Sequence, residues 1–238
     1  MILSLQKIQN KEYKKIKEKN PDFKVIRGNE IYLCRDNLNG QNFIKGEDKY
    51  YHFILLAKDA EGHKQLRQLS SIAWMNSYWD RGMERCVTTY SDLREIVNKY
   101  PDSLIATTAC LGGELSTNTM NLISAETVGD KEGAATAHNN IVNFMLWCKE
   151  LFGEDFYVEC APASSRDQVM VNERLVPISQ AFGVKMVVGS DAHYLKKEDR
   201  YIHKAYLNSK EGEREVDSFY EFAHLMDNNE AYEYLKES

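Results

Sequence analysis

An aspartate and a histidine that follow an apolar run near residue 190 are the residues best placed to do chemistry. The segment reads KMVVGSDAHY over 185–194, so Asp191 and His193 are two positions apart, just after a predicted strand. The carboxyl ends of parallel strands form the ligand crevice of α/β folds. A carboxylate and an imidazole at this spacing can point to the same side and bind one metal ion. The alternative is structural, with Asp191 capping the next helix and His193 packing against it.

Four further residues of metal-binding or acid–base type lie in or beside other predicted strands. They are Glu30 in VIRGNEIYLC, His52 in YYHFILLAK, Cys110 at the end of SLIATTAC, and Glu159 in FYVEC. Each also has a structural interpretation: an exposed or paired carboxylate, a hydrogen-bonded core histidine, or a small buried thiol. Because parallel strands would bring these positions to one edge of a sheet, the sequence predicts that they converge.

The other polar candidates carry weaker signals. Arg81 and Arg85 in WDRGMER are candidate phosphate contacts, because guanidinium groups bind phosphate through paired hydrogen bonds. The remaining histidines lie in helical or polar contexts and are interpreted as surface or structural residues: His63, His138, His203 and His224. The sequence contains no Walker A loop, no GxGxxG and no GxSxG, which argues against a nucleotide-binding fold and a serine hydrolase.

Short β-prone runs alternate with longer amphipathic stretches along the chain. The predicted strands are 24–34, 51–57, 103–108, 155–160 and 185–189. The predicted helices are 61–78, a short helix to Tyr100 with Ser91 as its N-cap, 130–152 and 166–182. This order predicts parallel βαβ units with right-handed crossovers. The first 23 residues are predicted to be the end of a helix followed by a turn at Pro21.

Composition and charge restrict the class of protein. The 238 residues include 36 acidic and 30 basic ones, for a formal net charge of −6, and the pI is about 5.6. This balance gives no bulk attraction for nucleic acid, so any DNA contact is expected to be local or made by another part of a larger protein. Five cysteines without a CxxC pair fit neither a disulfide framework nor a zinc ribbon. No apolar run is long enough to cross a bilayer and the N-terminus lacks a secretory pattern, so we expect no membrane partner and a cytoplasmic location.

Five motifs taken together resemble those of a known family. They are FKVIRGNEIYL (23–33), YHFILLAKDAEG (51–62), ACLGGE (109–114), FGEDFYVE (152–159) and SDAHYL (190–195). In this order and spacing they resemble the PHP domain of bacterial and phage DNA polymerase III alpha subunits, over about residues 5–210. The resemblance implies an α/β fold, a PHP-type distorted (β/α)7 barrel with a polynuclear metal site at the carboxyl ends of its strands. It also implies a PHP-like domain over 1–210 and an acidic helical appendage over 211–238 that leads to the next domain.

The resemblance also implies a ligand set. Five residues match positions that line the family's metal centre: Glu30, His52, Cys110, Asp191 and His193. Glu159 matches a family position as well and is an additional candidate site residue. The implied cofactor is a divalent metal, zinc or manganese, with magnesium as an alternative. The family's opening strand, which bears an HxH pair, has no counterpart before Glu30, so we expect a barrel that is incomplete at its N-terminus and an incomplete metal site.

Two functions from different classes follow from the resemblance. In the first, the chain is a non-polymerising domain of a DNA-directed DNA polymerase in DNA replication, where it supports the polymerase core. Its expected partners are then the rest of the polymerase chain, DNA bound through that polymerase, and a proofreading exonuclease subunit. In the alternative, the chain is a metal-dependent phosphoesterase or 3′-5′ exonuclease of the PHP family. A third interpretation is a purely structural metal-binding module.

Overall fold

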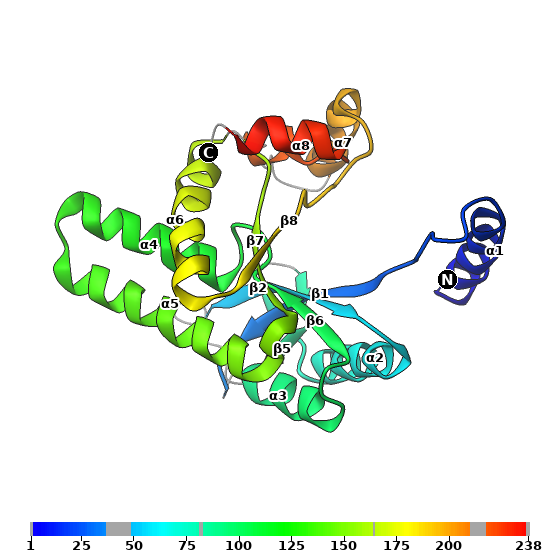
Figure 1. Cartoon of the computed structure of the whole chain (residues 1–238), viewed down its shortest axis with the longest axis horizontal. Helices are drawn as coiled ribbons and strands as arrows, with labels where there is room; N and C mark the ends of the chain where they lie inside the picture. Colours follow the sequence, from blue (N-terminus) through cyan, green and yellow to red (C-terminus); the bar gives the residue numbers. More distant parts are fainter. Residues whose placement is uncertain (1, 37–48, 81–82, 164, 210–217, 237–238) are drawn as a thin grey trace.

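The computed structural model describes residues 2–36, 49–80, 83–163, 165–209 and 218–236, and shows a mixed α/β fold around one central sheet (Figure 1). The sheet has the strand order β5-β1-β2-β6-β7-β8. Its strands are β1 (Arg27–Cys34), β2 (Tyr50–Ala57), β5 (Val87–Thr89), β6 (Leu104–Thr107), β7 (Phe156–Cys160) and β8 (Lys185–Val188). A separate two-stranded sheet pairs β3 (Tyr78–Asp80) with β4 (Met83–Arg85). The predicted α/β class is confirmed, and within the described residues the sheet remains open between β5 and β8.

The direction of β2 differs from the all-parallel arrangement that the sequence predicted. β1 pairs in parallel with β5, and β6, β7 and β8 are parallel to one another. β2, however, is antiparallel to both of its neighbours, β1 and β6. A parallel neighbour would need a crossover connection, usually a helix, and the sequence between β1 and β2 (RDNLNGQNFIKGEDK) has no helical repeat of apolar residues. As a result, the start of β2 lies at the same edge of the sheet as the carboxyl ends of β1 and β6.

The described part of the chain contains eight α-helices (Figure 1). They are α1 (Ile2–Lys19), α2 (Ala60–Met75), α3 (Tyr90–Lys99), α4 (Glu114–Val128), α5 (Lys131–Phe152), α6 (Arg166–Phe182), α7 (Arg200–Asn208) and α8 (Asn228–Leu235). Three short 3-10 turns are η1 (Gly153–Asp155), η2 (Lys197–Asp199) and η3 (Ser218–Phe222). α1 lies apart from the sheet in Figure 1. None of the helices that the structure describes has the length and apolar character needed to span a membrane.

Helix boundaries follow the local capping chemistry. α5 begins after Asp130, whose side chain accepts a hydrogen bond from the Gly133 amide, and α6 ends at Gly183 in the left-handed conformation. The predicted cap at Ser91 is wrong. Thr89 caps α3 instead, because its side chain accepts from the Asp92 amide while the Asp92 carboxylate accepts from the Thr89 amide. α4 and the three-residue strands β3, β4 and β5 were not predicted.

One face of the sheet carries the hydrophobic core. Leu33, Phe53 and Leu55 are completely or almost completely buried and pack with residues of α2, α3, α5 and α6. Along β1 and β2 these core residues alternate with less buried ones, so Glu30, Tyr32, His52 and Ile54 share the opposite face of the sheet, which we call the polar face because it carries Glu30 and His52. β5 and β8 are the two edge strands of the sheet, and the β8 residues Val187 and Val188 are 38% and 47% exposed.

Gly62 fixes the distance between α2 and β6. A Cβ atom at this position would lie 2.0 Å from the carbonyl oxygen of Ser103, which directly precedes β6. The amide of Gly62 donates to the side chain of Asp59, the N-cap of α2. Backbone contact at this point therefore requires a residue without a side chain.

We expect Gly62→Ala to destabilise the protein. Alanine is favoured over glycine in a helix by about 1 kcal/mol, but the clash with the Ser103 carbonyl should reverse this and reduce the free energy of unfolding by about 1–3 kcal/mol. Urea denaturation of the full chain measures the difference. The control is Ser71→Ala at an exposed position of the same helix, with an expected change within about 0.5 kcal/mol. A Gly62→Ala variant as stable as the wild type would show that α2 can shift away from β6.

Candidate metal centre

Three of the predicted site residues converge at one edge of the sheet. The Oε1 atom of Glu30 lies 2.5 Å from Nδ1 of His52, and Sγ of Cys110 lies 3.5 Å from the same nitrogen. One donor atom from each residue lies within 4.8 Å of the donor atoms of the other two. Carboxylate oxygen, imidazole nitrogen and thiolate sulfur are all metal-ligating atoms. We call Glu30, His52 and Cys110 the donor triad.

The register of β1 against β2 places the first two donors. Tyr32 pairs with His52, and Glu30 pairs with Ile54, so Glu30 and His52 are diagonal neighbours on the polar face. The turn after β6 then closes over His52, whose amide donates to the Gly112 carbonyl at 3.0 Å. A Cβ atom at Gly112 would lie 3.2 Å from the His52 ring, so the turn approaches the imidazole closely. This approach places Cys110 beside the ring.

A proton holds the donor triad together electrostatically. The hydrogen bonds that His52 makes with Cys110 and then with Glu30 raise the pKa of His52 from 6.5 to about 10, against the opposing effect of burial. The hydrogen bond to His52 in turn lowers the pKa of Glu30. The imidazolium is thus the cation between two groups that can carry negative charge. A divalent metal ion could replace this proton, because metal binding requires deprotonated ligands.

Asp191 and His193 lie at the same edge but outside the triad. The positive charge of His193 contributes to the lowered pKa of Glu30, which indicates that the two side chains are near each other. Burial is the main cause of the raised pKa of Asp191. The charge of Glu30 adds to this effect, while the charges of His193 and His52 and a hydrogen bond with Cys110 oppose it. Asp191 does not cap the next helix, because η2 begins after Lys196.

The backbone that delivers these residues is strained at two positions. Ala109, directly before Cys110, has φ of 58°, and Asp191 has φ of 44°. Non-glycine residues with positive φ are uncommon, and they concentrate at sites where the surrounding structure enforces them. Ala109 directly precedes the candidate ligand Cys110, and Asp191 is itself a candidate ligand. The strain therefore coincides with the edge at which the candidate ligands gather.

Glu159 is a buried carboxylate beside this group. Glu159 is 7% exposed, and its carboxylate accepts a short hydrogen bond from the Thr107 hydroxyl. Burial raises its pKa, and the negative charges of Asp191 and Glu30 add to that effect. A Cβ atom at Gly189 would lie 2.0 Å from Oε1 of Glu159, so the carboxylate reaches the end of β8. Glu159 thus extends the cluster of carboxylates from β7 toward Asp191.

Arg85, the predicted phosphate contact, lies against two tyrosines of the central sheet. Its Nη1 donates to the Tyr32 hydroxyl at 3.2 Å, and its guanidinium lies over the rings of Tyr32 and Tyr50. Arg81 lies outside the described residues. Of the histidines assigned structural roles, His224 is 3% exposed and bonded to Glu230 at 2.7 Å. His203 lies unexpectedly close to the site, because its ring centroid is 5.5 Å from that of His193.

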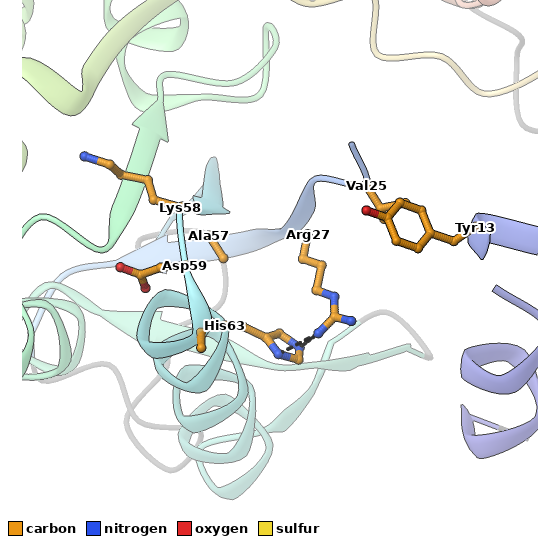
Figure 2. Close-up of a pocket in the computed structure, with 8 residues that line it drawn as sticks. Tyr13, Val25, Arg27, Ala57, Lys58, Asp59 and His63 are labelled. Carbon is orange, nitrogen blue, oxygen red and sulfur yellow. Dashed lines mark hydrogen bonds between the residues drawn. The ribbon is translucent and has the colours of Figure 1, made fainter. Parts of the chain in front are cut away.

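A cavity of about 380 Å³ lies elsewhere, between α1 and the start of α2 (Figure 2). Tyr13, Arg27 and His63 line it, and Nη1 of Arg27 is 2.9 Å from Nδ1 of His63. None of the donor triad lines this cavity. The candidate metal ligands therefore lie at a different place from this cavity.

Comparison with known proteins supports the expected family. The PHP domain family matches residues 7–163. The chain is 44% identical over 226 residues to the probable DNA polymerase YorL of Bacillus subtilis and to the DNA-directed DNA polymerase of Bacillus phage SPbeta. It is 34% identical over 185 residues to the DNA polymerase III subunit alpha of Borreliella burgdorferi. These alignments cover 94%, 94% and 76% of this chain, but only 17%, 17% and 14% of the relatives, which are far longer.

We expect Glu159→Gln to stabilise the metal-free protein at neutral pH. Because the folded-state pKa of Glu159 is raised, its contribution to stability is fully present at low pH and is lost as the pH rises through that pKa. Glutamine stays neutral and can still accept from Thr107. The gain in free energy of unfolding should therefore be near zero at about pH 4 and positive at neutral pH.

Urea denaturation in the presence of a chelator measures this pH dependence. The matched control is Glu154→Gln, because the Glu154 side chain is 90% exposed. A variant that is less stable than the wild type at neutral pH without metal would contradict the assignment of Glu159 as a destabilising buried carboxylate.

Proposed function

The chain belongs to the PHP domain family, and on this premise we propose that it is the PHP domain of a replicative DNA polymerase of the DNA polymerase III alpha type. In this proposal it binds a divalent metal ion and supports the polymerase core, in the cytoplasm, as part of a longer polypeptide. The long relatives support the proposal, since the chain spans 17% of the first two and 14% of the third. Template-directed nucleotidyl transfer would be carried out by the rest of such a protein.

The observation that supports metal binding is the convergence of Glu30, His52 and Cys110, with Asp191 and His193 at the same edge. The donor atoms fit a transition metal, because a carboxylate, an imidazole and a thiol are brought together with a displaceable proton between them. A thiolate donor favours zinc over manganese or magnesium, which prefer oxygen ligands. We therefore propose zinc as the preferred ion and manganese as the alternative.

Each residue has a distinct proposed role. Glu30, His52 and Cys110 bind the ion, and Asp191 and His193 contribute from the end of β8. Glu159 lies near Asp191, and the hydrogen bond that it accepts from the Thr107 hydroxyl fixes the position of its carboxylate. A bound divalent ion would supply Lewis-acid polarisation of a phosphoryl oxygen. In the structural version of this function, the same ligands instead tie β1, β2 and the turns after β6 and β8 into one unit.

The alternative function is a metal-dependent phosphoesterase or 3′-5′ exonuclease. The observation that favours it is the pair of carboxylates with raised pKa, Asp191 and Glu159, next to the donor triad. Carboxylates with raised pKa in one cluster are typical of sites that hold or move a proton. In this alternative, the substrate is a phosphate ester, which for the exonuclease is DNA itself. In the polymerase proposal, the partners are instead the rest of the polymerase, DNA bound through it, and a proofreading exonuclease subunit.

We expect the full chain to bind zinc through the donor triad. His52→Ala and Cys110→Ser should each lower zinc affinity by at least about tenfold in calorimetric titration, because each removes one of three donors. The affinity of the wild type should rise with pH between about 6 and 9, since zinc must displace the proton that His52 holds. His138→Ala, at an exposed position of α5, is the control. Unchanged affinity in both triad variants would refute this metal site.

We expect this chain to hydrolyse phosphate esters slowly or not at all. Among the described residues, one group of three donor atoms lies within 4.8 Å, which is enough to hold one metal ion. In-line displacement by two metal ions requires a second donor set at a fixed distance from the first. The assay uses the purified chain with zinc or manganese, and single-stranded DNA or p-nitrophenyl phosphate as substrate. Robust turnover that is abolished by His193→Ala would instead support the phosphoesterase alternative.

A further inference from the structure

The position of His193 is fixed from two directions by its own turn and by the C-terminal segment. Its Nδ1 lies 2.6 Å from the carbonyl oxygen of Asp191, and its amide donates to the Ala223 carbonyl at 2.7 Å. A carbonyl can only accept, so Nδ1 carries a proton, and in the neutral imidazole the lone pair is then on Nε2. This is the tautomer that a metal-ligating histidine needs at Nε2.

The ring of His193 packs against two aromatic side chains that the sequence analysis did not assign to the site. The centroid of Tyr220 lies 5.2 Å away at an interplanar angle of 79°, and that of His203 lies 5.5 Å away at 62°. These are edge-to-face contacts, an arrangement that aromatic pairs favour. We call Tyr220 and His203 the aromatic wall. The His193 side chain is 35% exposed, so the wall covers it only in part.

The aromatic wall is itself held by the C-terminal segment. The Tyr194 hydroxyl donates to the Tyr220 carbonyl at 2.5 Å, and the Arg200 guanidinium lies 5.9 Å from the centre of the Tyr220 ring. Next to it, Tyr194 and His224 form a parallel β-bridge, and buried His224 is bonded to Glu230. Several contacts made by the C-terminal segment therefore hold Tyr220 in place. The Tyr220 ring in turn contacts the ring of His193.

We infer that Tyr220 is a positioning residue that orients the His193 imidazole for metal binding. Tyr220 supplies no donor atom of the candidate metal centre; its ring restricts the rotation of His193 so that Nε2 keeps its direction. Loss of the ring would leave the imidazole free to rotate, and part of the binding free energy would be lost in ordering it again. This inference rests on the proposed metal site, because it requires His193 to be a ligand.

The test compares substitutions of Tyr220 that keep or remove the aromatic ring, in the full chain. Tyr220→Leu should lower zinc affinity by about tenfold, the lower end of the range for residues that orient a ligand, whereas Tyr220→Phe should stay within about twofold of the wild type. Tyr220→Met, which also removes the ring, replaces Tyr220→Leu if that variant does not fold. Tyr232→Leu is the matched control, since Tyr232 is 65% exposed on α8.

A second readout separates positioning from general stability. Cobalt is substituted for zinc, and the visible absorption of the bound ion reports its coordination number and geometry. The expected result is a changed cobalt spectrum in Tyr220→Leu or Tyr220→Met, and a wild-type spectrum in Tyr220→Phe and Tyr232→Leu. A folded variant without the ring that keeps wild-type zinc affinity and the wild-type spectrum would overturn the inference.

His193→Ala distinguishes this inference from the proposed function. If the wild type binds no zinc, or if His193→Ala binds it as tightly as the wild type, then the assignment of His193 as a ligand fails. If His193→Ala weakens binding and the variants without the ring do not, then only the role of Tyr220 is refuted.

Discussion

The antiparallel pairing of β1 with β2 is the constraint on which the candidate site depends. Because Tyr32 pairs with His52, Glu30 and His52 lie on the polar face of the sheet while Leu33 and Phe53 lie in the core. Shifting one strand by a single residue would turn His52 toward the core and a buried apolar side chain toward the site. Burial of the apolar face thus holds the ligands in register. The stability of the core and the geometry of the site are consequences of the same set of strand contacts.

The metal-free site brings like charges close together, and this has a cost for the fold. Glu30, Asp191 and Glu159 share one edge, and His52 and His193 are the nearby groups able to offset them. Two backbone positions with positive φ add strain at the same edge. Such features are expected where the structure serves a ligand and not only its own stability. A bound cation would relieve the repulsion between the carboxylates, which physically links ion binding to folding.

The sequence predicted the elements with a strong periodic pattern and missed those formed by tertiary contacts. The five predicted strands and the helices over 61–78, 130–152 and 166–182 are present within a few residues. Strand direction could not be read from periodicity, so β2 was assigned the wrong direction. Motif order indicated which residues would gather, whereas Tyr220 and His203 had no such signal, because they reach His193 through the packing of the C-terminal segment. The cap of α3 was misplaced because Thr89 and Ser91 are both good capping residues, and only the reciprocal bonds with Asp92 distinguish them.

The exposed edge of the sheet affects how the protein behaves in concentrated solution. β8 has the sequence KMVV, with Val187 and Val188 partly open to solvent and Lys185 as its one charged residue. Natural sheets protect such edges with charges, prolines, bulges or a covering segment, because free backbone groups pair readily with another strand. An uncovered β8 would make this chain prone to self-association and aggregation at the concentrations that crystallisation requires. A second lysine in place of Val188 would act against this association, because Val188 pairs with Cys160 and so lies on the face opposite Glu159 and the candidate ligands.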